Sequence, residues 1–331
     1  MDNFVAWWQS AIGFGTVIML GALGEITTQK AGHLNLGVPG LMFLGGFAGF
    51  ASAFLYEKTA NPSSFILIIL PIIVAAVVAG LGGLLYSFLT VTLKANQNVT
   101  GLALTYVGVG IGSFGGQYIT NAAGSGTYER AQLASDLFTA NIAKAANLSD
   151  PFSKMFLSYG FMIYLAIVIA VIMHFVLQKS RVGLNLRAIG ESPATADAAG
   201  INVTKYKYLA TISGAAISGL GGMVYILIFC NGGWATTNGI EALGWLAVAL
   251  VIFATWRPLN AIWGSYLFAL LYWFHAYSSV INLKLTTAQA DLMQMLPYVV
   301  TILVLLFISL RKKKENQPPA SLGLNYFRED R

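Results

Sequence analysis

The chain has 331 residues, of which 56% are hydrophobic and only 10% are charged, and its formal net charge is +6. An ordinary soluble domain carries about 25% charged residues, so this composition excludes a water-facing surface over most of the molecule. A mean hydropathy of +0.69 and 35 glycines instead indicate a helical protein that crosses a membrane many times. Most basic residues lie beside apolar runs, as membrane topology requires, so nucleic acid binding is not expected.

The first apolar run is expected to remain in the protein as a membrane span. Asp2 precedes it where a signal peptide would carry basic residues, and no small-residue cleavage signature follows. Cys230 is the single cysteine of the chain. An intrachain disulfide and a multi-cysteine metal site are therefore excluded.

The apolar runs predict an all-α, polytopic bundle, because a hydrocarbon core about 30 Å thick requires roughly 20 apolar residues per helix. About nine spans, with a range of eight to ten, are expected in a single transmembrane domain over residues 1–311, followed by a basic tail over 312–331. The predicted spans are 5–26, 34–55, 65–93, 99–119, 156–178, 208–229, 240–256, 259–281 and 295–310.

The distribution of Lys and Arg predicts the orientation. The basic run at 311–314 is expected to hold the C-terminus in the cytoplasm, and nine spans then leave the N-terminus outside. With this orientation 14 of the 19 Lys and Arg residues are cytoplasmic. The five that remain outside are Lys58, Arg130, Lys144, Lys154 and Lys284.

Two loops interrupt the apolar pattern. The external loop, about 120–155, starts with the glycine-rich NAAGSGTYER and continues with a more helix-like stretch, which leaves a docking surface and a solvated connector both open. The cytoplasmic loop, about 179–207, contains RAIGESPATADAAGINV at 187–203. Ser192 is suited to be the N-cap of a short helix at 193–199, Pro193 to be its first residue and Gly200 to end it.

The alanine-rich face of this predicted helix consists of Ala194, Ala198 and Ala199. Two helical turns are marginal alone in water, so something must pack on them. The residues by themselves leave open whether this is another protein or the chain's own bundle.

Three segments resemble one known family. They are GEITTQKAGHLNLGVPGLMFLGG at 24–46, GLNLRAIGESPATADAAGINVTKYKYLATISGAAISGLGGM at 183–223 and LAVALVIFATWRPLNAIWGSYLF at 246–268. In this order they resemble the permease subunits of bacterial ABC importers, in the branch that serves simple sugars and nucleosides. Within that branch, the chain is most similar to the nucleoside permeases that pair with a second, non-identical permease.

The resemblance implies that a separate ATPase subunit, which uses ATP and Mg, docks on the helix at 191–200. The residues expected to couple the ATPase to the bundle are Arg187, Gly190, Glu191, Ala198 and Gly200. It also implies a second permease, an extracytoplasmic substrate-binding lipoprotein, and transport of a nucleoside or simple sugar across the plasma membrane by alternating access. No cofactor is expected in the chain itself, and no G-x-x-x-x-G-K-[ST] phosphate loop occurs in it.

The chain departs from the family at Gln29 and Pro39, where the family commonly carries acidic residues, so no carboxylate role is transferred to these positions. Proline at position 39 removes a backbone donor and fixes φ, which predicts an irregular start to the second span. Such backbone is tolerated in a membrane where it lines a cavity or is buried in protein.

Polar residues in the spans are candidates for the substrate pathway, since lipid-facing helices rarely carry them. These candidates are Glu25, Asn35, Asn98, Thr105, Gln117, Glu241 and Trp245. Glu25 and Asn35 are equally suited to cap a broken helix. A tryptophan at a membrane boundary, such as Trp245, more often only anchors the interface. Gly108, Gly112 and Gly116 are expected to serve helix packing.

Two other classes of protein compete with the importer. An autonomous secondary transporter or channel for small neutral polar solutes is the main alternative, although proton-driven carriers usually need more ionisable groups in the membrane. A membrane-embedded enzyme is disfavoured because the chain has no zinc-type His/Glu motif, nucleophile elbow or paired carboxylates on one helix face. His174 and His275 are interpreted as core histidines with satisfied hydrogen bonds rather than metal ligands.

Overall fold

The computed structural model describes residues 2–122, 130–146, 150–234, 238–278, 286–311 and 317–327. Over these ranges the regular structure is helical, and β structure is limited to two isolated bridges, Arg130 with Gly233 and Asn141 with Gly160. The predicted all-α bundle is confirmed.

Seven helices within the described ranges are long and apolar enough to cross a membrane. They are α1 (Asp2–Lys30), α2 (Val38–Glu57), α3 (Ser64–Ser87) continued by the π-helical turn η1 (Phe88–Thr92), α4 (Gln97–Ala122), α8 (Phe161–Lys179), α11 (Val203–Val224) continued by η2 (Tyr225–Phe229), and α14 (Thr287–Gln294) continued by α15 (Leu296–Arg311). The two other predicted spans fall on α12 (Asn238–Phe253) and α13 (Pro258–Trp273), which have 16 residues each. Both are shorter than the roughly 20 residues of a full crossing, so seven spans meet the length criterion where nine were predicted.

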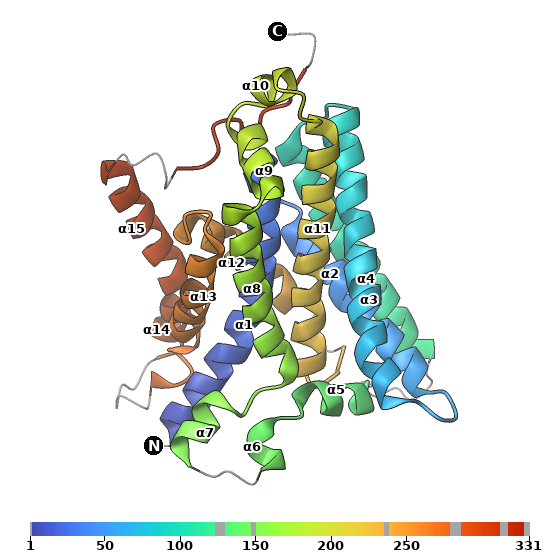
Figure 1. Ribbon diagram of the computed structural model, residues 1–331. Helices are drawn as coiled ribbons and strands as arrows, with labels where there is room; N and C mark the ends of the chain where they lie inside the picture. The colour runs from blue at the N-terminus through green and yellow to red at the C-terminus, as the bar shows by residue number, and fades with distance from the viewer. Residues whose placement is uncertain are drawn as a thin grey trace.

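α1 forms the centre of the bundle (Figure 1). It packs against α11, α12 and α13, while α2 packs against α3, α4 and α11. Most of α1 is inaccessible to solvent and lipid, including Val17, Ile18, Leu20 and Leu23. A helix surrounded by others in this way requires apolar residues around its whole circumference, which the sequence of α1 provides.

Glycine contacts set the close approach of α2 to its neighbours. A methyl group at Gly222 of α11 would overlap the carbonyl of Met42 in α2, and one at Gly108 of α4 would overlap the backbone of Gly40. Equivalent methyl groups at Gly112 and Gly116 would overlap the side chains of Phe43 and Trp234. The helix packing predicted for Gly108 and Gly112 is therefore confirmed, whereas Gly116 packs on Trp234 in the loop after η2.

Short helices cover the two ends of the bundle. At the end where α1 begins, α5 (Gln132–Thr139), α6 (Ile142–Ala145) and α7 (Pro151–Phe156) connect α4 to α8. They pack on the bundle: Trp8 donates a hydrogen bond to the carbonyl of Met155, and Glu57 accepts one from the backbone N–H of Leu133. At the opposite end lie α9 (Arg181–Glu191), α10 (Pro193–Ala198) and residues 317–327, named here the tail segment (Figure 1).

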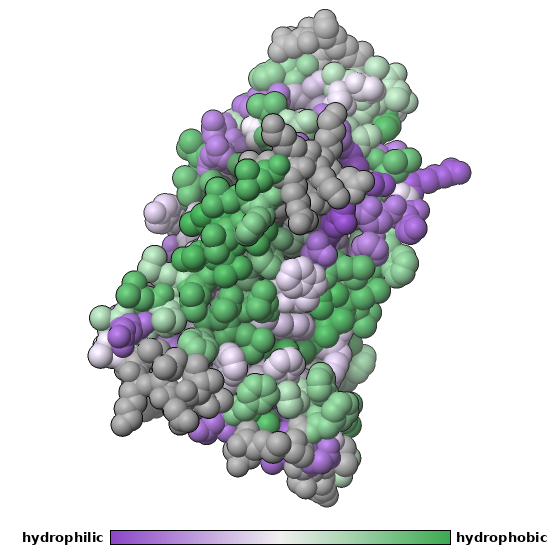
Figure 2. Space-filling view, turned by 90° about the vertical axis from the view of Figure 1, so that its left-hand side faces the viewer, coloured by the Kyte–Doolittle hydropathy of each residue, from purple (hydrophilic) through white to green (hydrophobic). Residues whose placement is uncertain are grey.

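The outer surface of the bundle is mainly apolar. Figure 2 shows hydrophobic side chains over the middle of one face and hydrophilic side chains gathered toward its upper end. Large hydrophobic side chains of α3, α4, α8 and α15 are exposed, among them Phe65, Phe114, Phe175 and Leu310. An apolar surface of this extent is typical of helices that face lipid or another membrane subunit.

Candidate functional site at the α10 end of the bundle

α10 is the short helix predicted in the loop 179–207. The hydroxyl of Ser192 accepts a hydrogen bond from the backbone N–H of Thr195 at 3.3 Å, and Pro193 is the first helical residue. The helix ends at Ala198, and Gly200 follows with a φ of +82°. Glycine adopts this left-handed conformation without the steric cost that other residues bear. The predicted cap, first residue and terminating glycine are confirmed, in a helix one residue shorter than expected.

The outer face of α10 is made of small apolar side chains. Ala194, Ala198 and Ala199 are exposed, whereas Ala196 is buried in a small core with Ile189 and Val203. A helix of six residues is not stable alone in water. The core contact of Ala196 and the caps at both ends therefore hold α10 in place, and its alanine face is left accessible.

The tail segment joins α10 to the first half of the chain. The hydroxyl of Tyr326 donates a hydrogen bond to the Asp197 carboxylate at 2.8 Å, and Lys94 donates one to the backbone carbonyl of Tyr326 at 2.7 Å. Asn325 donates to the carbonyl of Lys94, and Ser321 donates from its backbone N–H to the carbonyl of Gly190. The C-terminal stretch, which the sequence presented only as a basic tail, thus bridges α10 and the α3–α4 turn.

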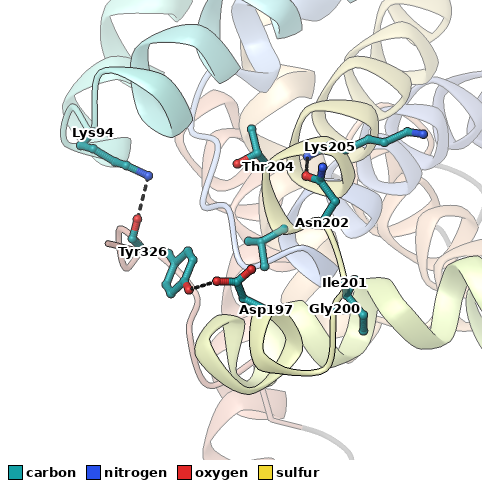
Figure 3. Close-up of a pocket in the computed structure, with 9 residues that line it drawn as sticks. Lys94, Asp197, Gly200, Ile201, Asn202, Thr204, Lys205 and Tyr326 are labelled. Carbon is teal, nitrogen blue, oxygen red and sulfur yellow. Dashed lines mark hydrogen bonds between the residues drawn. The ribbon is translucent and has the colours of Figure 1, made fainter. Parts of the chain in front are cut away.

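A cavity of about 580 Å³ lies between α10, the start of α11 and the tail segment. Figure 3 shows Lys94 and Asp197 reaching Tyr326 from opposite sides, with Asn202 and Thr204 at the start of α11 beside them. Asn202 caps α11 by accepting a hydrogen bond from the backbone N–H of Lys205 at 2.9 Å. The cavity is therefore a mainly polar recess next to the C-terminal end of α10.

The predicted coupling residues Arg187, Gly190 and Glu191 all lie on α9. Arg187 is half-buried and Glu191 is exposed, and both line a second cavity at this end of the bundle. Gly190 is buried, and a methyl group there would overlap the carbonyl of Lys30 at the end of α1. Gly190 is therefore a point of close contact between α9 and α1, whereas Gly200 stands free, with no atom within 4 Å of a Cβ placed there.

Residues 31–37, named here the broken turn, separate α1 from α2. Its backbone is non-helical but hydrogen-bonded to side chains of several helices. Gln97 accepts from the N–H of Leu34 at 2.8 Å, Tyr86 donates to the carbonyl of Leu34 at 2.8 Å, and Thr105 donates to the carbonyl of Leu36 at 2.9 Å. The irregular start predicted for the second span is present, and its buried backbone groups are satisfied by protein, as such a position requires.

Glu25 fixes the broken turn from the side of α1. Its carboxylate accepts hydrogen bonds from the backbone N–H of Asn35 at 3.2 Å and from the side-chain amide of Gln29 at 2.8 Å. Gln29 in turn accepts a hydrogen bond from the indole N–H of Trp256 at 2.6 Å. The Gln29 side-chain amide thus donates one hydrogen bond and accepts another. A carboxylate at position 29 would have no N–H to donate to Glu25, so glutamine, although it departs from the family pattern, fits this position.

The three segments that carry the family resemblance meet at this end of the bundle. Gln29 contacts Trp256 of the 246–268 segment, and the Gly24 backbone lies against Ser218 of the 183–223 segment. Thr255 and Trp256 have φ angles of 52° and 54°. This left-handed region is sterically strained for residues other than glycine. Such a conformation persists only where the surrounding contacts hold the backbone in place.

The predicted pathway residues do not form one site. Glu25, Asn35 and Thr105 come together at the broken turn, where Asn35 accepts a hydrogen bond from the N–H of Gly37. Asn98 and Gln117 are exposed on α4. Glu241 and Trp245 are half-buried on α12. The capping contacts of Glu25 and Asn35 are thus observed, while a pathway role for all seven residues stays a prediction.

The sequence interpretation missed several residues of the site. Those at the broken turn are His33, Tyr86, Gln97 and Thr211, and those in the tail segment are Ser321, Asn325 and Tyr326. The residues at the broken turn could have been identified from the sequence as polar residues within or beside otherwise apolar spans. No local pattern marked the second group, because its partners lie more than 100 residues away.

The two histidines interpreted as satisfied core residues differ. His275 lies within 2.6 Å of the carbonyl of Tyr272 through Nδ1 and stacks on Trp273. Nδ1 of His174 is buried without a hydrogen-bond partner, so the expectation of satisfied bonds is wrong for this residue. Across the described part of the chain, no three His, Cys, Asp or Glu side chains are grouped to hold a metal ion.

The described ranges contain seven apolar helices of membrane length, so the chain is a multi-pass membrane protein. Residues 9–305 match the family described as the permease component of the branched-chain amino acid transport system, and the chain belongs to this family. The resemblance seen in the three sequence segments is confirmed.

Curated relatives cover almost the whole chain. It is 32% identical to a putative glucose ABC transporter permease protein of Haloferax volcanii, TsgC13, over 95% of both chains. It is 28% identical to the nucleoside ABC transporter permease protein NupC of Lactococcus lactis over 95% of this chain and 94% of NupC. The guanosine ABC transporter permease protein NupQ of Bacillus subtilis is 27% identical over 88% of both. No solved structure matches the chain.

Proposed function

We propose that this chain is the membrane-spanning permease of an ATP-driven importer of nucleosides in a bacterial plasma membrane. Family membership and the relatives named for nucleosides and guanosine support this assignment. The observation that carries it is the alanine face of α10, which is exposed on a helix held rigidly by its caps, by Ala196 and by the tail segment.

In this proposal α10 is the contact for a separate ATPase subunit that uses ATP and Mg. Small side chains allow a partner's groove to approach the helix backbone closely, and the polar recess beside α10 offers hydrogen-bonding groups at its edge. Displacement of α10 would pass to α1 through α9, because Gly190 touches the end of α1. From there it would reach the broken turn and α2, so that the bundle opens alternately to each side of the membrane.

The proposed assembly contains a second, non-identical permease and an extracytoplasmic substrate-binding lipoprotein. The α10 end faces the cytoplasm and the end with α5–α7 faces outward, in accordance with the positive-inside rule. Uncharged nucleosides fit a pathway whose polar groups are mainly amides and hydroxyls, such as Asn35, Asn98, Thr105 and Gln117. A simple sugar is the alternative cargo, and uptake competition between the two classes distinguishes them.

The test is co-purification of the ATPase with the permease. Ala198→Trp places a large ring on the alanine face and is expected to abolish ATPase recovery, while the permease itself stays folded because Ala198 is exposed. Ala103→Trp, at an exposed position of α4, is the matched control and should leave recovery unchanged. Full recovery of the ATPase with Ala198→Trp would refute docking at α10.

A further inference from the structure

A second cavity, of about 630 Å³, lies where α1, α8 and α9 end on the α10 side of the bundle. Among the described residues, its charged lining consists of Lys30, Lys179, Arg187, Arg257 and Glu191. Four cations around one carboxylate give the lining a net positive charge. Such a recess attracts an anion, because charge of one sign in a concave surface concentrates the electrostatic field.

Two polar atoms beside this cavity are buried without a partner. Nε of Arg187 and Nδ1 of His174 make no hydrogen bond to any described residue. The terminal nitrogens of Arg187 reach only Gln178, at the long distances of 3.4 and 3.5 Å. Nearly all buried polar groups in native proteins find a partner, so the guanidinium of Arg187, whose hydrogen bonds to Gln178 are long, has terminal N–H groups left for a further acceptor in the cavity.

The position of the cavity indicates where the acceptor comes from. His174 and Lys179 belong to the last two turns of α8, and the same helix exposes an apolar stripe at Leu165, Val168, Ile172 and Phe175. These residues recur every three or four positions and therefore lie on one face. An amphiphile could place its charged group in the cavity and its chains along this stripe.

We propose that this cavity binds the phosphodiester headgroup of an anionic phospholipid, whose acyl chains lie against α8. A phosphodiester offers acceptor oxygens to the guanidinium of Arg187, which is well suited to phosphate. Basic pockets between the ends of membrane helices recognise acidic headgroups in this way. The proposal does not depend on which solute is transported. Arg187 and Glu191 are also among the residues predicted to couple the ATPase to the bundle, so the test includes the ATPase subunit as a competitor.

The test measures lipid binding to the full-length purified chain by native mass spectrometry. Phosphatidylglycerol and phosphatidylcholine with the same acyl chains are compared, and glycerol 3-phosphate is added in a separate arm. The wild-type chain should prefer phosphatidylglycerol, and Arg187→Gln should weaken its binding about fivefold while phosphatidylcholine binding stays the same. Arg181→Gln, which removes an exposed cation outside the cavity, is the control and should change neither.

Should Arg187→Gln fail to fold, Lys179→Gln takes its place, because Lys179 is exposed and lines the same cavity. Equal binding of the two lipids to the wild-type chain would overturn the proposal, as would an equal loss in the Arg181→Gln control. Glycerol 3-phosphate competing as well as phosphatidylglycerol would make the site one for free phosphate esters. Displacement of the lipid by the ATPase subunit would assign the cavity to that partner. Either of these two results contradicts a lipid site.

Discussion

Glu25 is the acceptor on which the broken turn depends. Its buried carboxylate accepts hydrogen bonds from the backbone N–H of Asn35 and from the side-chain amide of Gln29. Glu25→Ala leaves both donors unpaired, and we expect a loss of about 2 kcal/mol in the free energy of unfolding. Thermal unfolding of the two proteins in detergent measures this loss of stability. Glu25→Gln retains an acceptor oxygen and should lose less; equal losses for both variants would show that hydrogen bonding at this position does not stabilise the turn.

His33 is expected to make the broken turn sensitive to acid. Burial holds the pKa of His33 well below its usual value, and the positive charges of Lys207 and Lys94 lower it further. Thr211 and Tyr86 are its uncharged neighbours. The folded chain keeps His33 neutral at pH values where the unfolded chain already binds a proton. Stability should therefore fall as the pH drops below about 6.5.

The melting temperature of the wild-type chain and of His33→Gln, followed from pH 7.5 to pH 5, tests this expectation. The wild-type chain should lose more stability over this range than the variant, which has no proton to bind. His275→Gln is the control and should follow the wild-type profile. Identical profiles for the wild-type chain and His33→Gln would mean that another group causes any acid sensitivity.

The contact between α2 and α11 depends on the absence of side chains. Gly222→Ala inserts a methyl group against the carbonyl of Met42, so we expect a loss of about 1–3 kcal/mol in stability. Gly110→Ala is the control, because no atom lies within 4 Å of a Cβ at that position of α4. This variant should be neutral or slightly stabilising, since alanine favours helix more than glycine does. Size-exclusion profiles and melting temperatures of the two variants are compared with those of the wild-type chain. A melting temperature of Gly222→Ala equal to that of the wild-type chain would contradict the close packing of α2 and α11.

The tail segment is expected to stabilise α10 through the hydrogen bond between Tyr326 and Asp197. Tyr326→Phe removes the hydrogen bond to Asp197 and keeps the ring. The amides of α10 should then exchange hydrogen for deuterium about fivefold faster, which corresponds to the loss of about 1 kcal/mol from local stability. Tyr118→Phe, on the exposed surface of α4, is the control. Unchanged exchange in Tyr326→Phe would show that α10 is ordered without the tail.

Short-range chemistry accounts for the parts of the site that the sequence predicted well. Ser192, Pro193 and Gly200 define α10 through backbone hydrogen bonding and allowed φ angles, which depend on neighbours in the chain. Pro39 marked the break before α2 for the same reason. The bridge from Tyr326 to Asp197 and the bond from Trp256 to Gln29 were not predictable, because they join residues more than 100 positions apart.

Hydropathy predicted the helical membrane bundle and placed a helix in each of the nine expected segments. It did not settle how many helices cross completely. α12 and α13 are apolar but have 16 residues each, and a hydropathy window does not separate a short buried helix from a full span. The polar residues predicted to line the pathway lie at several separate places in the structure. Hydropathy along the sequence does not show which faces of α4 and α12 point into the bundle.

The whole molecule combines a tightly packed first half with a short helix, α10, that exposes its alanine face at one end. α1 and α2 are held by α11 through glycine contacts, and α9 carries α10 on the end of α1. A force applied at α10 would thus reach the centre of the bundle through close contacts at Gly190 and the broken turn. This arrangement suits a subunit moved by an external motor.

Nucleoside uptake into proteoliposomes tests this account most directly. The permease is reconstituted alone and together with its ATPase, second permease and binding lipoprotein, and uptake of radiolabelled guanosine is followed with and without ATP. We predict uptake only with the full assembly and ATP, and its loss in Ala198→Trp but not in Ala103→Trp. Guanosine uptake by the permease alone, without ATP, would contradict the account and identify an autonomous carrier or channel.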